Sequence, residues 1–240
     1  MLPDQENNML LPAKNLGTVL ESREESFLVS REEPESISAD QYRVLLNRID
    51  RAGVTRPLRT IAITSCARGE GRTITAANLA YTAARDGREV LLVECDLRRP
   101  SLAGLFELAP GPGLAEVVEG KAELSQALAR VGYLTVLAAG DASDIPVVLR
   151  SPRLAATMET LRSSFSLIVL DLPPALALSD AGRLATSADG IVLVVRAGET
   201  PRDVVRMAID ALPDRVLGIV LNGVDEPGYR RYLRSEAIGV

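Results

Sequence analysis

Histidine is absent from this sequence and cysteine is scarce, and both facts exclude classes of function. The 240 residues contain no histidine, so the chain cannot build a catalytic site in which a histidine base activates a serine or cysteine nucleophile. Its two cysteines are Cys66 and Cys95, which are too few for a zinc site. We expect both to be small buried residues that form no disulfide.

Long apolar runs and an excess of positive charge are also missing. No stretch approaches the roughly 18 consecutive apolar residues that a membrane-spanning helix needs. The net charge of -5 gives no general attraction to nucleic acid. The N-terminus lacks the positively charged start and the apolar centre of a signal peptide. We therefore expect a cytoplasmic protein that does not bind nucleic acid.

Apolar runs alternate with helical patterns from residue 59 onward. We predict strands at residues 60–64, 89–95, 134–138, 167–172, 190–195 and 216–221, and helices at residues 73–86, 153–163 and 201–212. Most of the strands are continuous apolar runs, which is typical of a parallel sheet buried on both faces. The sequence therefore predicts a doubly wound α/β fold with a mainly parallel sheet, whose ligand lies at the carboxyl ends of the strands.

The remainder of the chain divides by composition. Residues 1–35 are polar and acidic, and we expect them to form a flexible arm. Residues 36–52 carry apolar side chains at helical spacing, which predicts an amphipathic helix that packs on the main domain or on another subunit. The main domain is expected at residues 58–224, and residues 225–240 are its C-terminal tail.

The most informative stretch is residues 60–80, which combine a short apolar strand, a glycine-bearing turn and an alanine-rich helix. A phosphate-binding loop has this form, because glycines let backbone N–H groups approach phosphate and a closing Gly-Lys-Ser/Thr supplies a lysine and a magnesium-binding hydroxyl. Gly71 and Thr73 fit the pattern, but Arg72 replaces the lysine. The residues predicted to bind nucleotide are Arg68, Gly69, Glu70, Gly71, Arg72, Thr73, Ile74 and, at the end of the last strand, Asn222.

Acidic side chains stand at the ends of two predicted strands, on the sheet edge where the glycine loop opens. We expect the carboxylates of Glu94 and Asp96 to point the same way and to share a magnesium ion or a hydroxyl proton. Asp171 ends an apolar strand in the manner of a Walker B aspartate, which holds magnesium directly or through water. A lone aspartate at a strand end is more often a turn residue, so the prediction depends on the loop and the carboxylates occurring together.

These motifs, in this order, resemble those of the bacterial tyrosine autokinases of capsular and exopolysaccharide synthesis. The loop of that family usually reads Gly-Glu-Gly-Lys-Ser/Thr, and residues 69–73 read Gly-Glu-Gly-Arg-Thr. Its second acidic motif, Asp-x-Asp-Leu-Arg-Arg-Pro, is similar to Glu-Cys-Asp-Leu-Arg-Arg-Pro at residues 94–100, and Asp-x-Pro-Pro at residues 171–174 resembles its Walker B segment. The resemblance covers residues 36–224 and implies a stand-alone member of the MinD/ParA-like P-loop ATPases with a degenerate Walker A motif.

The resemblance implies ATP or ADP and Mg²⁺ as cofactors. It places Thr73, Asp96 and Asp171 around the magnesium, and it lets Glu94 or Asp96 accept the proton of the substrate tyrosine. Arg72 would neutralise the transferred charge, which makes Arg72, Glu94 and Asp96 the predicted catalytic residues. The family also implies a membrane polysaccharide copolymerase as partner. We therefore expect a protein at the inner face of the cell membrane that contacts the membrane only through this partner.

The sequence departs from the family pattern at several places. Arginine is longer than lysine and planar, so Arg72 keeps the charge but alters the geometry, and we expect weak or absent activity. The family's subunit-contact motif, Glu-x-x-Arg-x-x-Arg, is represented by Asp40, Arg43 and Leu46, which leaves a homo-oligomer as an open alternative. The tail holds few acceptors for autophosphorylation. Those predicted are Tyr229 and Tyr232.

These departures favour one hypothesis over two others. The favoured hypothesis is a pseudokinase that keeps the kinase fold and, together with the copolymerase, regulates polysaccharide polymerisation and export. The alternative is an active ATP-dependent tyrosine autokinase that phosphorylates its own tail. A third hypothesis, a MinD/ParA-like positioning ATPase, is weaker because the tail has too few apolar residues for a membrane-binding helix.

Overall fold

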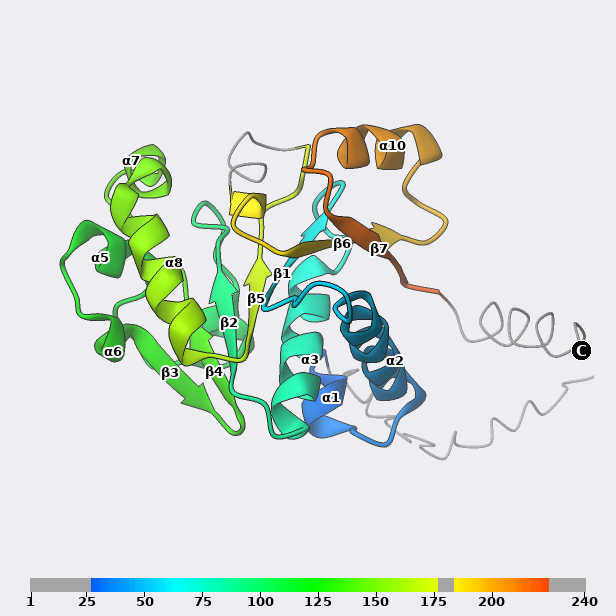
Figure 1. The fold of residues 1–240 in the computed structure, drawn as a ribbon, viewed down its shortest axis with the longest axis horizontal. Coiled ribbons are helices and arrows are strands. Elements are labelled where there is room, and N and C mark those ends of the chain that lie inside the picture. The colour runs from blue at the N-terminus through cyan, green and yellow to red at the C-terminus, as the bar shows by residue number, and fades with distance from the viewer. Residues whose placement is uncertain (1–26, 177–183, 225–240) are drawn as a thin grey trace, which may run out of the picture.

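The computed structural model describes residues 27–176 and 184–224, in which helices cover a central sheet (Figure 1). Among these residues, none of the helices is long and apolar enough to cross a membrane. Tyr229 and Tyr232, the predicted phosphorylation sites, lie outside the described residues. The structure therefore bears on the P-loop domain and not on the tail.

The sheet has seven strands in the order β3-β4-β2-β5-β1-β6-β7. Neighbouring strands are parallel except β3 and β4, which are antiparallel. The strands are β1 (Thr60–Ser65), β2 (Val90–Glu94), β3 (Leu128–Val131), β4 (Leu134–Leu137), β5 (Leu167–Asp171), β6 (Gly190–Arg196) and β7 (Val216–Asn222). The predicted doubly wound α/β fold with a mainly parallel sheet is confirmed.

Helices cover both faces of this sheet. On one face α3 packs against β1, β2 and β5 and carries α1 and α2 on its outer side, while α8 packs on β5 beside α5 and α7 (Figure 1). The helices are α1 (Val29–Glu32), α2 (Ile37–Ala52), α3 (Arg72–Arg85), α4 (Leu102–Leu105), α5 (Leu114–Glu119), α6 (Leu124–Ala127), α7 (Ile145–Arg150), α8 (Pro152–Ser164) and α10 (Arg202–Asp210). The amphipathic helix expected at residues 36–52 corresponds to α2, which packs on α3.

The central strands are buried on both faces, which explains their continuous apolar sequences. In β2, Leu91 and Val93 belong to the hydrophobic cluster that includes α8, whereas Val90 and Leu92 belong to the cluster that includes α3. Successive strand residues point to opposite faces, so a strand between two helical layers is apolar throughout. Strand β3 was not predicted, because its four residues are only partly buried or exposed and form no apolar run.

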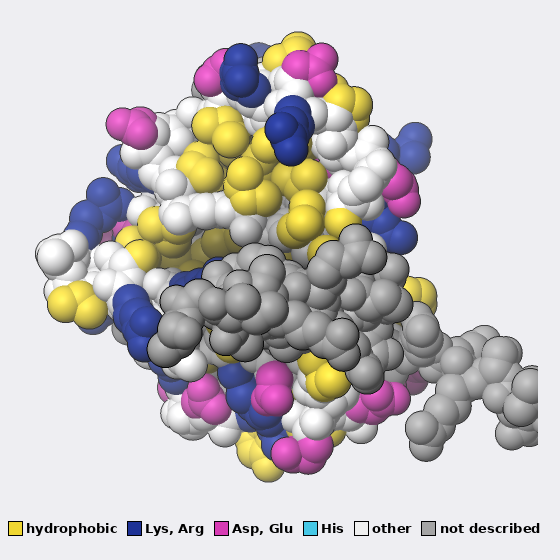
Figure 2. Space-filling model, turned by 90° about the vertical axis from the view of Figure 1, so that its right-hand side faces the viewer, with side chains coloured by type: hydrophobic (Ala, Val, Ile, Leu, Met, Phe, Trp, Pro, Cys, Tyr) yellow, Lys and Arg dark blue, Asp and Glu magenta, His cyan; other side chains and the backbone are white. Residues whose placement is uncertain are grey.

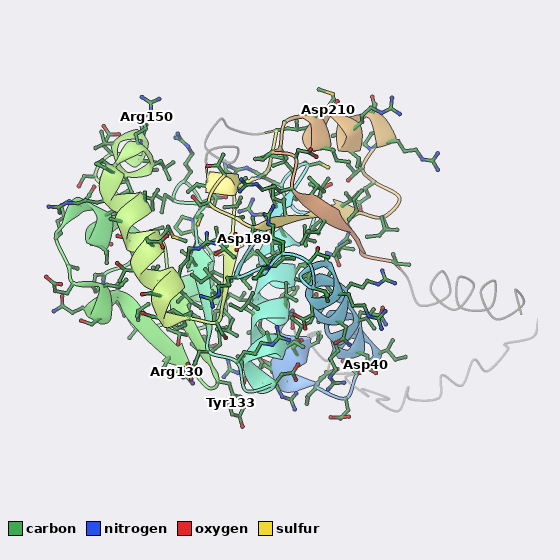
Figure 3. All side chains as sticks on the ribbon, in the orientation of Figure 1. Asp40, Arg130, Tyr133, Arg150, Asp189 and Asp210 are labelled. Carbon is green, nitrogen blue, oxygen red and sulfur yellow. The ribbon has the colours of Figure 1, made fainter. Side chains whose placement is uncertain are left out.

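The carboxylate of Asp189, which directly precedes β6, forms hydrogen bonds with the start of β1 and with α8. It accepts hydrogen bonds from the backbone N–H groups of Arg59 and Thr60 at 2.9 and 2.8 Å, and from Nη2 of Arg162 at 2.8 and 3.0 Å. Although burial raises its pKa, these donors hold the pKa of Asp189 below its ordinary value. Figure 3 shows Asp189 in the middle of the molecule, whereas Asp210 lies at its outer side.

Strand β7 forms one edge of the sheet and exposes apolar side chains. Leu217, Ile219 and Leu221 alternate along the strand, so they share one face, and they are 37%, 50% and 58% exposed. Figure 2 views the molecule from this side and shows hydrophobic side chains gathered in the upper part of the surface. Strand β7 was predicted as one of the sheet strands, but unlike β2 it has one face that the described residues leave uncovered.

The end of the N-terminal arm differs from the prediction, because residues inside the expected flexible range form helix α1. Leu28 and Ser30 are buried there. The backbone N–H of Ser30 donates to Asn78 Oδ1 at 2.9 Å, and Asn78 Nδ2 donates to the carbonyl of Phe27 at 2.8 Å. The Thr82 hydroxyl adds a bond of 2.9 Å to Ser30 Oγ. Polar composition predicts flexibility, but it does not reveal that side chains of α3 satisfy these backbone groups.

Replacement of Asn78 by alanine should loosen this N-terminal segment. Asn78 is fully buried and also donates to the carbonyl of Ile74 at 2.9 Å. We expect N78A to lower the free energy of unfolding by about 1–3 kcal/mol, because buried polar groups lose their partners. Urea unfolding measures this loss, and hydrogen exchange should become faster in residues 27–32.

Thr160→Ala is the matched control, since it removes only a hydrogen bond of 3.0 Å to the carbonyl of Ala156 on the exposed side of α8. It should leave exchange in residues 27–32 unchanged. Protection of that segment that persists in N78A would show that Asn78 does not hold it.

Candidate functional site

The loop between β1 and α3 forms the floor of the candidate site. Gly69 and Gly71 have φ angles of +82° and +87°, in the region that glycine adopts without steric cost. Helix α3 begins at Arg72 with Gly71 as its N-cap, so the unpaired N–H groups of its first turn border the loop. A helix N-terminus of this kind favours an anion, as the predicted phosphate-binding loop requires.

Polar side chains from distant parts of the chain brace this loop. Glu70 is buried, and its carboxylate accepts hydrogen bonds from the N–H of Ala67 at 2.8 Å and from the Thr200 hydroxyl. Asn222 Nδ2, at the end of β7, donates to the Glu70 carbonyl at 2.9 Å. Glu70 and Asn222 were expected to contact nucleotide, and that role stays a prediction. Thr200 was not predicted to belong to the site, although it lies at a position where the resembled family has a recognisable residue and directly before Pro201.

Arg72 lies between two aspartates at the carboxyl edge of the sheet. Its Nη2 donates to Asp96 Oδ2 at 2.5 Å, and its Nε donates to Asp171 Oδ1 at 3.2 Å. The Thr73 hydroxyl donates to Asp171 Oδ2 at 2.7 Å. The side chain of Arg72 is 12% exposed, and those of Asp96 and Asp171 are 3% and 0% exposed. The residues predicted to surround magnesium are thus together, but the Arg72 guanidinium joins the two carboxylates directly.

Burial controls the titration of the groups around this cluster. It raises the pKa of Asp171 to about 6, although the charge of Arg72 and the hydroxyl of Thr73 lower that pKa. Burial, together with nearby carboxylates, raises the pKa of the Cys95 thiol, and it raises the pKa of Cys66 to about 11. Both cysteines are free and buried, as expected. Their thiols stay protonated at neutral pH and are therefore poor nucleophiles.

The carboxylates of Glu94 and Asp96, which were expected to point the same way, accept hydrogen bonds from different groups of the chain. Strand β2 ends at Glu94, so the alternation of a strand does not extend to Asp96. The carboxylate of Glu94 accepts hydrogen bonds from the backbone N–H groups of Ser101, Leu102 at 2.9 Å and Ala139 at 3.2 Å. Burial raises the pKa of Glu94, although these bonds lower it. They give Glu94 a structural role, and its catalytic role stays a prediction.

A pocket of about 660 Å³ lies over the loop and the Arg72 cluster, a volume suited to a small-molecule ligand. The predicted site residues in its lining are Arg68, Gly69, Gly71, Arg72, Thr73, Ile74, Asp96 and Asn222. Arg99 and Arg196 also line it and were not predicted, although a basic residue at the carboxyl end of a strand, as Arg196 is, was an available signal. The excess of arginine over aspartate in the lining favours an anionic ligand.

The sequence is similar to a known family and to curated proteins. The ParA family model, described as NUBPL iron-transfer P-loop NTPase, matches residues 57–223. The tyrosine-protein kinase YwqD of Bacillus subtilis is 34% identical over 216 residues, which cover 88% of this chain and 90% of YwqD. The succinoglycan biosynthesis transport protein ExoP of Rhizobium meliloti is 34% identical over 201 residues, which cover 80% of this chain but 26% of ExoP. The chain therefore spans nearly all of one relative and about a quarter of the other.

Solved structures have the same fold. The kinase domain of the Escherichia coli tyrosine kinase ETK aligns with a TM-score of 0.79 and 26% identity, covering 83% of this chain and 80% of that one. The septum site-determining protein MinD of Pyrococcus horikoshii, complexed with Mg-ADP, aligns with a TM-score of 0.55 and 26% identity over 70% and 72% of the two chains. The likeness thus extends beyond kinases to the wider ParA-like fold.

The close approach of Asn222 adds a second cost to alanine at Gly71, beyond backbone strain. A Cβ atom there would lie 2.0 Å from Asn222 Nδ2, whereas a Cβ atom at Gly69 would have nothing within 4 Å. Both alanine variants bear a backbone cost of about 1–2 kcal/mol, but only G71A must also displace Asn222 from Glu70. We expect a larger loss of unfolding free energy in G71A than in G69A, measured by urea unfolding.

Gly69→Ala is therefore the matched control for backbone strain alone. The double variant G71A/N222A should lose less stability than the sum of its two single variants, because the clash disappears with the amide. Equal losses in G71A and G69A would mean that Asn222 does not constrain the loop.

Proposed function

Because this chain belongs to the bacterial tyrosine-protein kinase family of ParA-like P-loop NTPases, we propose that it is a nucleotide-binding pseudokinase that regulates exopolysaccharide or capsule production. The polysaccharide pathway is supported by the name of ExoP, which acts in succinoglycan biosynthesis and transport. ATP or ADP as ligand is supported by the glycine loop and by the arginine-rich pocket above it. Kinase activity, by contrast, depends on the residue at position 72.

The observation that carries the proposal is the binding of Arg72 to Asp96 and Asp171. The lysine of an ordinary loop is a compact charge that reaches the β- and γ-phosphates. The planar guanidinium of Arg72 instead spans two buried carboxylates, and arginine does not replace lysine where geometry matters. An error of about 1 Å in placing the reacting groups can reduce the rate about 100-fold. We therefore expect phosphoryl transfer to be weak or absent.

Internal contacts of α2 support a regulator over a homo-oligomer of kinase subunits. Leu46, the last position of the family's subunit-contact motif, is 2% exposed and packs in the cluster that includes α3. Arg43, the middle position, pairs with Asp40 and donates to the Pro34 carbonyl at 2.7 Å. These bonds occupy groups that a neighbouring subunit would need. The partner that we propose is instead a membrane polysaccharide copolymerase, which would bring a cytoplasmic regulator to the inner face of the membrane.

The alternative function is an active tyrosine autokinase. Its support is that Arg72 keeps the positive charge and that Thr73, Asp96 and Asp171 lie beside it. In that case Asp96, which lines the pocket, is better placed than Glu94 to accept the tyrosine proton. A positioning ATPase is supported only by the fold that the chain shares with MinD.

Incubation of the purified protein with labelled ATP and Mg²⁺ tests the loss of kinase activity. We expect little or no label on Tyr229 and Tyr232 in the natural protein. Arg72→Lys should raise the label by about 100-fold, because a compact ammonium restores the placement of the phosphates. The double variant R72K/D96A should lose this gain. Label on the natural tail that vanishes in D96A would support the active autokinase instead.

The regulatory role is tested in cells through the length distribution of the polysaccharide. Deletion of the gene should alter this distribution, and the natural protein should restore it. The variant Y229F/Y232F should restore it equally, because the proposed regulator acts without tail phosphorylation. An unchanged polymer in the deletion strain would refute the regulatory role, and failure of Y229F/Y232F alone would show that phosphorylation is required.

A further inference from the structure

All four carboxylate oxygens of Asp96 and Asp171 already have donors from the chain itself. Oδ1 of Asp171 accepts from Arg72 Nε at 3.2 Å, and Oδ2 accepts from the Thr73 hydroxyl at 2.7 Å. Oδ2 of Asp96 accepts from Arg72 Nη2 at 2.5 Å, and Oδ1 accepts from the backbone N–H of Arg99 at 3.2 Å. These are the oxygens that the family pattern would offer to magnesium.

Magnesium does not fit this arrangement of side chains. Mg²⁺ requires near-octahedral oxygen ligands at about 2.0–2.1 Å. The guanidinium of Arg72 occupies the space between Asp96 and Asp171, and it would repel a dication strongly because the three side chains are largely buried. No group of three or more acidic, cysteine or histidine side chains elsewhere in residues 27–176 and 184–224 could hold a metal ion instead.

Arg72 retains hydrogen-bond donors for a ligand while the aspartates hold it. A guanidinium carries five N–H donors in a rigid plane. The bonds of Arg72 to the aspartates use Nε and Nη2, and its Nη1 has no hydrogen-bond partner within the part of the chain that the structure describes. Arg72 lines the pocket, so Nη1 is available to a phosphate oxygen there. Charge-assisted bonds of this kind are short and strong.

Other arginines extend the positive charge around the pocket. Arg68, Arg99 and Arg196 line it together with Arg72, whereas Asp96 is the one acidic side chain in its lining. Guanidinium groups match phosphate geometry and stay charged at every physiological pH. The chain therefore provides several permanent positive charges for the phosphates of a nucleotide, and no metal ion is needed to neutralise those phosphates.

We propose that Arg72 takes the place of the metal ion, so that this protein binds a nucleoside di- or triphosphate as the free anion, without Mg²⁺. Asp96 and Asp171 are then positioning residues for the guanidinium. The inference rests on the proposed function in taking a nucleotide as the ligand. It also gives a reason for binding without turnover, because phosphoryl transfer in P-loop proteins needs a metal ion that bridges the phosphates.

Isothermal titration calorimetry with ADP, in buffer with excess Mg²⁺ and in buffer with EDTA, tests the inference. We expect the dissociation constant of the natural protein to differ less than about twofold between the two buffers. Arg72→Lys should bind about tenfold more tightly with Mg²⁺ than with EDTA, because the shorter ammonium cannot span both carboxylates and leaves their oxygens to the metal.

Arg162→Lys is the matched control, since it alters a comparable arginine–carboxylate pair, with Asp189 at 2.8 Å, outside the pocket lining. Its ADP affinity should stay independent of Mg²⁺. A second variant, D171N, separates positioning from metal binding. If Asp171 positions Arg72, D171N weakens ADP binding equally in both buffers; if Asp171 serves a metal ion, D171N weakens it only in Mg²⁺.

Affinity of the natural protein that rises about tenfold or more with Mg²⁺ would overturn the inference, as would an absence of ADP binding in both buffers. The failures of the two proposals are distinguishable. Magnesium-dependent ADP binding by a protein that does not label its tail would refute only the metal-free site. An unchanged polymer in the deletion strain would refute only the regulatory role. Phosphotyrosine on the natural tail would refute the pseudokinase and the metal-free site together, because phosphoryl transfer needs a metal ion.

Discussion

The ion pairs of Arg72 with Asp96 and Asp171 constrain the rest of the candidate site. The fold brings these side chains together, because β2 and β5 are adjacent parallel strands and β1, which leads into Arg72, pairs with β5. Two carboxylates and one guanidinium are therefore delivered to the same buried edge. Ionised carboxylates without a partner would be very costly there. A single arginine shared between both aspartates relieves that cost. At the same time, its guanidinium occupies the position that a magnesium ion would need for phosphoryl transfer.

The shape of the glycine loop is maintained by contacts that do not involve Arg72. Glu70 receives bonds from Ala67 and Thr200, and Asn222 holds the Glu70 carbonyl. Thr200 follows β6 and Asn222 ends β7, so the loop is fixed by the two strands beyond β1. Loop geometry and the residue at position 72 are thus physically separate. A chain can exchange the lysine for arginine and still keep an anion-binding loop.

The sheet was predictable from the sequence because burial on both faces leaves continuous apolar runs, as in β2. The same reasoning missed β3, whose residues are only partly buried or exposed, and it missed α1, which depends on single hydrogen bonds to Asn78 and not on any periodic pattern. The glycine loop and the acidic strand ends were found because their chemistry is local in sequence. The hydrogen-bond partners of these residues were not predicted. The sequence around Glu94, for example, does not reveal that its carboxylate accepts hydrogen bonds from the backbone N–H groups of Ser101 and Ala139.

The N-terminal segment and the pocket share one support, helix α3. Phe27 and Val29 line the pocket beside the loop, and Asn78 of α3 binds the backbone on either side of Val29. The first residue of the same helix is Arg72, so both the cation and one wall of the pocket are fixed relative to α3. A site whose charges and walls are assembled before a ligand arrives loses little ordering free energy on binding. Such preorganisation suits a site that binds a nucleotide, as we propose.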